Sequence, residues 1–272
     1  MGKTTFVLQI LRNLAASGGA AVCFSFELDE MGVLERLLVQ EAYSSAGAAA
    51  PTVTQVRSLL SSLNPMTPLR EALSDVAGMA VAQAALQSYG DRLSVHVSSS
   101  RVTTTDVIRQ LVLAEVGAGR APVVVVDYLQ KVHVESMLGE DERVTLVVEA
   151  LKDLALEAAV PVIAVVAATQ AGIAPGHRLR VDELRGASAL AYEADVILLL
   201  NSKRDVVARH HLAYDPRSEE RFRQVAVVSI EKNRGGRSDV HVEFRKEFEY
   251  CRFDPGGNVL EEQLAETRTP TE

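Results

Sequence analysis

Near its start, the chain carries residues with the chemistry of a phosphate-binding loop. Gly2, Lys3, Thr4 and Thr5 stand directly before a run of helical periodicity. In such a loop, backbone N–H groups at the helix N-terminus hold phosphate oxygens, a lysine neutralises the β- and γ-phosphates, and a hydroxyl group ligates Mg²⁺. Lys3 has the position of that lysine and Thr4 that of the hydroxyl ligand. The segment is only the second half of the full motif, so it needs support from elsewhere in the chain.

Polar residues also follow apolar segments that resemble buried strands. Asp127 comes after four consecutive valines at 123–126, and Glu27 comes after an apolar segment at 20–26. Ligands of open α/β sheets bind outside the carboxyl ends of the strands. There, Asp127 could hold the Mg²⁺ shell and Glu27 could polarise an attacking water, while Gln170, after a third segment, could sense the γ-phosphate. The alternatives are a turn or capping role for Asp127 and solvated loop positions for the other two.

Helices and strands alternate through the chain, and the pattern predicts an α/β fold. Apolar spacing of i, i+3, i+4 and i+7 predicts helices, and uninterrupted apolar runs predict strands that helices cover on both faces. The alternation itself predicts a mostly parallel sheet. The predicted helices span residues 4–16, 31–42, 104–116 and 141–159, and the predicted strands span 20–26, 93–97, 123–126, 160–167 and 196–200.

Two stretches depart from this alternation. Residues 44–51 are rich in small side chains and predict a loop, with weak helices after it. In the last third, the apolar segments 222–230 and 240–244 flank a Gly235-Gly236 pair, which suits a hairpin turn. An antiparallel C-terminal edge of the sheet is therefore predicted.

The composition excludes several classes of protein. The chain has 272 residues, of which 47% are hydrophobic and 24% charged, and this excludes a wholly disordered or collagen-like protein. The formal net charge of −8 excludes a polycation that coats nucleic acid or an anionic membrane, so any nucleic-acid contact must be local. The apolar runs are well short of the roughly 20 residues that a membrane-spanning helix requires. The two cysteines predict buried thiols. We therefore expect a cytoplasmic protein without a membrane partner.

The order and spacing of the segments together resemble the C-terminal motor domain of DnaB-like replicative helicases, within the RecA-like ATPases. The resemblance implies a RecA-like P-loop NTPase core over residues 1–260 and a flexible tail over 261–272. It also implies ATP and Mg²⁺ as cofactors. The matching segments are Met1-Gly2-Lys3-Thr4-Thr5, Phe24-Ser25-Phe26-Glu27, Val126-Asp127-Tyr128-Leu129-Gln130, Gln170, Leu184-Arg185-Gly186, Glu193-Ala194-Asp195 and Glu231-Lys232-Asn233-Arg234-Gly235.

The resemblance implies a role for each matching side chain. The implied nucleotide-binding residues are Gly2, Lys3, Thr4 and Thr5, and the implied Mg²⁺-associated residues are Thr4 and Asp127. The implied catalytic residues are Glu27 as base and Gln170 as sensor. Lys232 and Arg234 are implied to act on the nucleotide of the neighbouring subunit. An arginine finger places a fixed cation against charge that develops on the transferring phosphoryl group, which requires a docked partner subunit. A homo-oligomer, specifically a hexameric ring, is therefore implied. The alternative for this segment is a solvated basic hairpin.

In the DnaB-like family, the loops after the Asp strand and the Gln strand face the central channel and hold single-stranded DNA. Here these loops span residues 131–143 and 171–185. A few cations can track phosphates without sequence preference, and six copies around a pore would multiply the effect, so an acidic monomer is compatible with this role. A solvated loop is the alternative. The residues predicted to contact single-stranded DNA are Arg178, Arg180, Arg185 and Gly186.

The resemblance fails at the start of the sequence, because a RecA-like core has its first strand and the front of its phosphate loop before Gly-Lys-Thr. One hypothesis is that Met1 is an internal methionine of a longer natural chain, and the other is a truncated product whose loop cannot enclose phosphates. Three functions stay open at this point. They are a DnaB-type helicase motor, a recombination or regulatory ATPase that does not unwind duplex, and a catalytically silent assembly or DNA-binding protein.

Overall fold

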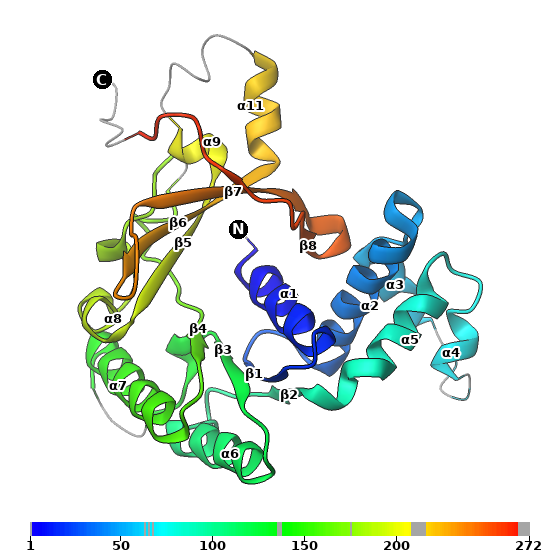
Figure 1. Ribbon diagram of the computed structural model, residues 1–272, viewed down its shortest axis with the longest axis horizontal. Coiled ribbons are helices and arrows are strands. Elements are labelled where there is room, and N and C mark those ends of the chain that lie inside the picture. The colour runs from blue at the N-terminus through cyan, green and yellow to red at the C-terminus, as the bar shows by residue number, and fades with distance from the viewer. Residues whose placement is uncertain are drawn as a thin grey trace.

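The structure is a computed structural model, and it describes residues 2–62, 64, 66, 68–134, 138–174, 176–207 and 216–265. Two β-sheets with helices packed around them make up this part of the chain (Figure 1). One sheet is parallel and the other antiparallel, which confirms the predicted α/β class.

The parallel sheet has four strands in the order β2-β1-β3-β4. They span Leu93–Val97 (β2), Ala20–Ser25 (β1), Pro122–Asp127 (β3) and Val162–Ala164 (β4). Ser25 pairs with Asp127 across the ladder, so β1 and β3 end at the same edge of the sheet. The predicted strand over 160–167 is therefore shorter in the structure, because only three of its residues join the ladder with β3.

Four helices cover the two faces of this sheet: α1 (Lys3–Ala16), α2 (Glu30–Ala46), α6 (Thr105–Gly117) and α7 (Glu140–Ala158). Successive side chains of a strand point to opposite faces. Val125 therefore packs against α1 and α2, whereas Val124 and Val126 pack against α6 and α7. This two-sided cover explains why the valine run carries no alternation with polar residues.

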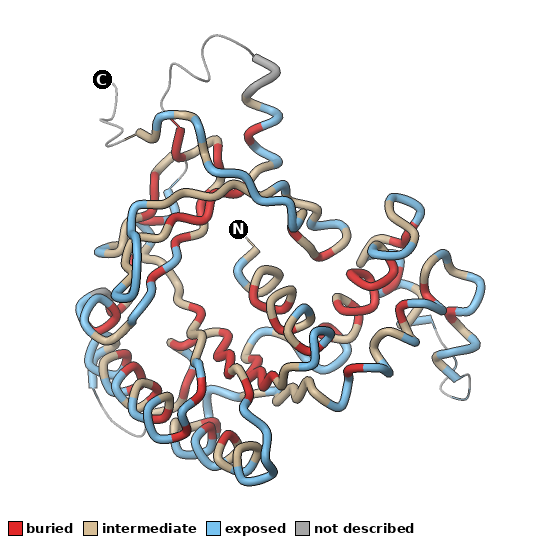
Figure 2. The backbone as a smooth tube through the Cα atoms, in the orientation of Figure 1, coloured by how far each residue is buried: buried red, intermediate tan, exposed pale blue. Residues whose placement is uncertain are grey.

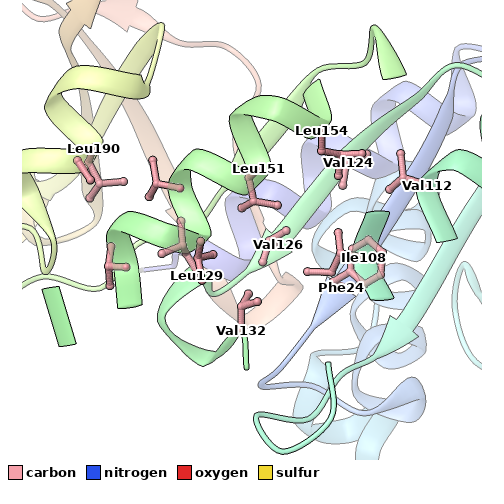
Figure 3. Packing of buried hydrophobic residues seen from close by; sticks show 14 of the residues in the cluster. Phe24, Ile108, Val112, Val124, Val126, Leu129, Val132, Leu151, Leu154 and Leu190 are labelled. Carbon is pink, nitrogen blue, oxygen red and sulfur yellow. The ribbon is translucent and has the colours of Figure 1, made fainter. Parts of the chain in front are cut away.

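The larger apolar cluster lies between the strands and α6 and α7. Figure 3 shows Leu151 of α7 beside Val126 and Leu154 beside Val124, with Phe24 of β1 close to Ile108 of α6. The two central strands β1 and β3 are buried over most of their length (Figure 2). Burying one such side chain contributes about 1.5–3 kcal/mol, so this cluster fixes the positions of β1 and β3 and of the residues at their ends.

The second sheet is antiparallel and has the order β5-β6-β7-β8, with β9 paired to β7. Its strands span Val196–Ser202 (β5), Val225–Asn233 (β6), Val240–Glu247 (β7), Arg252–Phe253 (β8) and Asn258–Val259 (β9). The predicted hairpin around the two glycines is confirmed as the turn between β6 and β7. The placement of strand 196–200 in the parallel alternation was wrong, because β5 pairs antiparallel with β6.

The segment between α2 and β2 forms a small helical layer with its own apolar cluster. The prediction of a loop over 44–51 was wrong in its first half, because α2 continues to Ala46. The remaining elements are η1 (Gly47–Ala49), α3 (Val53–Ser61), α4 (Leu69–Ala72), α5 (Met79–Tyr89), η2 (Gly90–Arg92), η3 (Leu129–Lys131), η4 (Val181–Glu183), α8 (Ala187–Glu193), α9 (Lys203–Val206), α11 (Pro216–Arg223) and η5 (Phe248–Tyr250).

Part of the predicted C-terminal tail is attached to α9, the helix that follows β5. Glu262 forms an ion pair with Lys203 at 2.6 Å, and the Ala265 N–H group donates to the Val206 carbonyl at 2.8 Å. Residues 266–272 of that tail lie outside the described residues.

Within the described ranges, every helix is too short or too polar to cross a membrane. Both cysteines are buried free thiols, as predicted.

Candidate functional site

The N-terminus of α1 is built to receive an anion. Its capping position is occupied by Gly2, whose left-handed backbone (φ +83°) offers no side-chain hydrogen bond to the first N–H groups of the helix. The first turn carries Lys3 and lacks acidic residues, although a cation there opposes the helix dipole. By contrast, α2 begins with Asp29, which accepts a hydrogen bond from the Gly32 N–H group at 2.7 Å. A bound phosphate would satisfy the free N–H groups of α1 and neutralise Lys3.

Gly2 is required by packing as well as by its backbone angle. A Cβ atom at this position would lie 2.6 Å from the Phe248 ring and 3.1 Å from the Phe253 ring. Gln9, two turns along α1, donates to the Phe253 carbonyl at 2.9 Å and accepts from its N–H group at 2.7 Å. These contacts hold the start of α1 against the end of the second sheet and so fix the direction of its N–H groups.

Asp127 lies beside the start of α1 and is buried, with 3% of its surface exposed. Burial raises the pKa of its carboxyl group, and the negative charge of Glu27 raises it further. A hydrogen bond with the Thr4 side chain and the positive charge of Lys3 act in the opposite direction on this pKa. Three of the other predicted site residues therefore act on Asp127 at one place in the fold.

The strand register explains why the two carboxylates meet. The Phe26 N–H group donates to the Asp127 carbonyl at 2.8 Å, which extends the β1–β3 ladder by one residue. Glu27 follows immediately and is exposed, whereas the side chain of Asp127 stays buried. The site thus has one buried carboxylate next to the Thr4 hydroxyl and one exposed carboxylate at the same sheet edge.

The oxygen atoms of Thr4 and Asp127 fit a magnesium ion. Both are hard donors, and the Thr4 side chain is close enough to lower the pKa of Asp127, so one cation could contact both. In the described part of the chain, no group of three or more His, Cys, Asp or Glu side chains could hold a metal by itself. A cation here would take its other ligands from water and from a phosphate, which is the usual arrangement for Mg²⁺.

Gln170 lies beyond β4 and is exposed, and it is not among the groups that shift the pKa of Asp127. A different glutamine joins the end of β3 to this region. The Gln130 side chain donates to the Arg185 carbonyl at 3.1 Å and accepts from the Ala167 N–H group at 3.2 Å. Sequence reasoning gave Gln130 no role, and its position three residues after Asp127 was the only available signal.

Lys232 and Arg234 lie at the end of β6 and contact the C-terminal end of α8. The Lys232 ammonium group donates to the Ala191 carbonyl at 2.5 Å, and the Arg234 guanidinium forms an ion pair with Asp195 at 3.1 Å. Arg234 also donates to the Tyr192 carbonyl. Desolvation and the charge of Arg234 lower the pKa of Lys232. These partners are separate from the Thr4–Asp127 group.

The four residues predicted to contact DNA differ in their surroundings. Arg178 is buried, with 9% of its surface exposed, and donates to Glu231 at 3.3 Å, whereas Arg180 is more exposed. Arg185 forms an ion pair with Glu140. Gly186 caps α8 with φ +82°. A cavity of about 340 Å³ lies there, and its lining includes Arg185 and Gly186 together with Glu140, Asp141 and Asp182.

Comparisons with known proteins agree with this arrangement. The family model described as the DnaB-like helicase C terminal domain matches residues 1–254. No curated protein sequence matches the chain. The fold is similar to that of a solved ATPase domain, with a TM-score of 0.70 and 20% identity over 93% of this chain and 80% of that one.

A second similar structure is that of a DnaB-like replicative helicase, solved to describe its interactions with primase. The TM-score is 0.72, with 19% identity over 93% of this chain and 54% of that one. The present chain therefore spans about half the length of that helicase. At 19% and 20% identity, the two structures show only that the fold is shared. The match to the family model is what assigns the chain to a family. The chain belongs to the DnaB-like helicase C-terminal domain family, a family of helicase-type ATPases.

Proposed function

We propose that the protein is the ATP-hydrolysing motor of a DnaB-type DNA helicase, working at subunit interfaces and moving on single-stranded DNA. One observation carries the proposal: the uncapped N-terminus of α1, with Lys3 and Thr4 in its first turn, lies against the buried carboxylate of Asp127. The free N–H groups and Lys3 suit the phosphates of a nucleotide, and Thr4 with Asp127 suits Mg²⁺. Residues 1–260 form the motor domain in this proposal.

Each residue of the site then has a distinct task. Gly2 and Thr5 line the phosphate-binding turn beside Lys3 and Thr4, and Mg²⁺ supplies charge neutralisation on the phosphate oxygens when it is bound. Glu27, exposed at the same sheet edge, orients and deprotonates the attacking water. Gln170, on the exposed segment beyond β4, contacts the γ-phosphate and reports its presence to the loop that follows.

The remaining two catalytic residues act on a neighbouring copy of the chain. Lys232 and Arg234 lie on a hairpin whose contacts are separate from the phosphate site, which suits cations that serve another subunit. A hexameric ring would bring this hairpin to the nucleotide of the next subunit. A fixed cation there would stabilise charge that develops during phosphoryl transfer.

Single-stranded DNA is the proposed track of the motor. The loop 171–185 carries Arg180 and Arg185 with partly exposed side chains, the buried Gly186 at the start of α8 lines the cavity beside them, and three carboxylates nearby limit the positive charge to this region. Such a surface favours contacts to the phosphate backbone without sequence preference. Arg178 would join them only after leaving Glu231.

The test is Mg-ATP hydrolysis with and without an oligothymidylate, on wild type and three variants. Lys3→Ala should abolish nucleotide binding and hydrolysis. Arg234→Ala should lose at least about 10²-fold in turnover while it keeps nucleotide binding, because the finger acts on charge formed in the reaction. Arg237→Ala, on the same hairpin, is the matched control.

Two outcomes would overturn the proposal. Equal loss of nucleotide binding in the Lys3 and Arg234 variants would contradict a role in trans. DNA binding that is unaffected by Lys3→Ala, in a chain that does not hydrolyse ATP, would instead support a silent assembly or DNA-binding protein.

A further inference from the structure

Glu231 of β6 holds two arginines of the loop 171–185 at once. One oxygen of its carboxylate accepts from Arg178 at 3.3 Å and lies 3.6 Å from a nitrogen of Arg180. The Arg178 side chain is 9% exposed and that of Glu231 is 17% exposed. This is the ion pair that joins the predicted DNA-contacting loop to the strand that carries Lys232.

The loop bridges the two sheets, so its position depends on both. At its base, the Thr169 N–H group donates to the Glu183 carbonyl at 2.8 Å, which closes the loop beside the end of β4. Near its middle, the Leu179 N–H group donates at 3.1 Å to the side chain of Asn201, a buried residue of β5. Glu231 adds the third attachment, on β6.

Glu231 also occupies an irregular point of its strand. Ile197 of β5 faces Lys232, and the next residue, Leu198, faces Ile230, so Glu231 is an extra residue on β6 with no partner on β5. Such a bulge bends a strand and redirects its side chains. A change in the side-chain position of Glu231 would be transmitted directly to Lys232, its neighbour in the chain.

The ion pair between Arg178 and Glu231 has a high free-energy cost for an interaction that would only stabilise the fold. Burial lowers the pKa of Arg178, and the adjacent charge of Arg180 lowers it further, against the effect of Glu231. The Nε–H group of Arg178 is buried and has no hydrogen-bond acceptor among the described residues. A buried ion pair of this kind is a weak source of stability compared with apolar packing.

We propose that Glu231 is a positioning residue that couples the loop 171–185 to Lys232 and Arg234, and this inference rests on the proposed function. A DNA phosphate competes with the Glu231 carboxylate for Arg178 and Arg180, because guanidinium groups bind both anions in the same geometry. When the arginines change partner, the bulge at Glu231 relaxes and shifts the two cations that serve the neighbouring subunit. DNA on one subunit thereby adjusts hydrolysis in the next.

The first arm of the test measures amide hydrogen exchange, which requires no activity. Wild type is compared with Glu231→Gln and with Arg180→Gln, whose side chain is 37% exposed, so that its replacement leaves the packing of the core unchanged. Exchange of residues 231–238 should be at least about fivefold faster in both variants, in the lower range of typical site-to-site coupling. Unchanged exchange would overturn the inference whatever the protein's activity. Glu157→Gln, which breaks an exposed pair between α6 and α7, is the control.

The second arm measures hydrolysis with and without an oligothymidylate long enough to span the loop. Glu231→Gln, which frees the arginines as DNA would, should keep its KM for ATP, raise its basal turnover toward the DNA-stimulated value and lose about fivefold or more of the DNA stimulation of kcat. The double variant Glu231→Gln with Arg178→Gln should lose no more DNA stimulation than either single variant, because both substitutions remove the same contact. Additive losses, or full stimulation in Glu231→Gln, would overturn the coupling. Absence of hydrolysis in wild type would count against the proposed function, and the exchange arm would still decide this inference.

Discussion

Replacing Asp127 by Asn should make the protein more stable and remove its activity. The carboxylate is 3% exposed, and burial together with Glu27 raises its pKa, so at neutral pH the folded state holds a charge that its surroundings disfavour. Asparagine has the same shape and can still accept the hydrogen bond from Thr4, but it carries no charge. Removing such a strained functional charge is expected to add about 0.5–2 kcal/mol to the free energy of unfolding.

The pH dependence of this gain has a defined sign. Because the pKa of Asp127 is raised on folding, the folded state binds the proton more tightly than the unfolded chain does. Its contribution to stability is fully present below the ordinary aspartate pKa of about 3.9 and is lost as pH rises through the higher folded value. The Asp127→Asn variant has no carboxyl group at this position, so it does not lose this stability as pH rises. The two proteins should therefore differ in stability at neutral pH and converge in acid.

Urea unfolding at neutral pH and at a pH below about 3.9 measures the effect, and a thermal shift of about 2–4 °C should accompany each kcal/mol. Glu27→Gln is the matched control, because Glu27 is exposed and its neutralisation should change the stability much less. Mg-ATP at about 100 times its Kd should stabilise wild type by about 2.7 kcal/mol and the Asn variant far less. A variant that is equally or less stable than wild type at neutral pH would refute the view that burial strains this carboxylate.

Three further substitutions test the framework around the site. Gly186→Ala should lower the free energy of unfolding by about 1–3 kcal/mol in urea titration, since its Cβ atom would overlap the Val144 side chain and its φ is +82°; an unchanged midpoint would contradict that close approach. Arg12→Leu should cost about 3 kcal/mol in the same assay, because it leaves the buried carboxylate of Glu41 without its cation, and a neutral result would contradict this account. Leu151→Ala should cost about 2–5 kcal/mol, and a smaller loss would mean that the core between β3 and α7 collapses around the cavity.

The sequence predicts the parallel sheet well because its signals are local. Uninterrupted apolar runs are typical of two-sided burial, and the helices between them follow from spacing alone, so β2, α6 and α7 lie within a residue of the predicted bounds. The direction in which β5 pairs was not predictable in the same way. An apolar run is equally compatible with a parallel and an antiparallel neighbour, and the neighbour of β5 is β6, which follows it in sequence.

The candidate site likewise combines features that local sequence patterns predict with a contact that they do not. Lys3, Thr4, Glu27 and Asp127 were predicted to converge because helix N-termini and the carboxyl ends of parallel strands share one edge of a sheet, and the structure brings these four together. The burial of Arg178 was not predicted, because it depends on Glu231, which is 53 residues away in sequence. No local pattern marks such a pair. The predicted roles in catalysis and DNA binding stay predictions.

Arg234, which follows β6, and Arg178, on the loop 171–185, differ in how firmly they are held, and this difference bears on how subunits would work together. Arg234 pairs with Asp195 at positions where the two side chains are 50% and 60% exposed, and exposed pairs contribute little to stability. A docking subunit could therefore take Arg234 from Asp195 at small cost. Arg178 is buried and Glu231 is half-buried, so an anion must reach the loop and replace the carboxylate before that pair separates. The weak contact suits an exchange at every docking event, and the strong one suits an exchange that occurs only when a polyanion is bound.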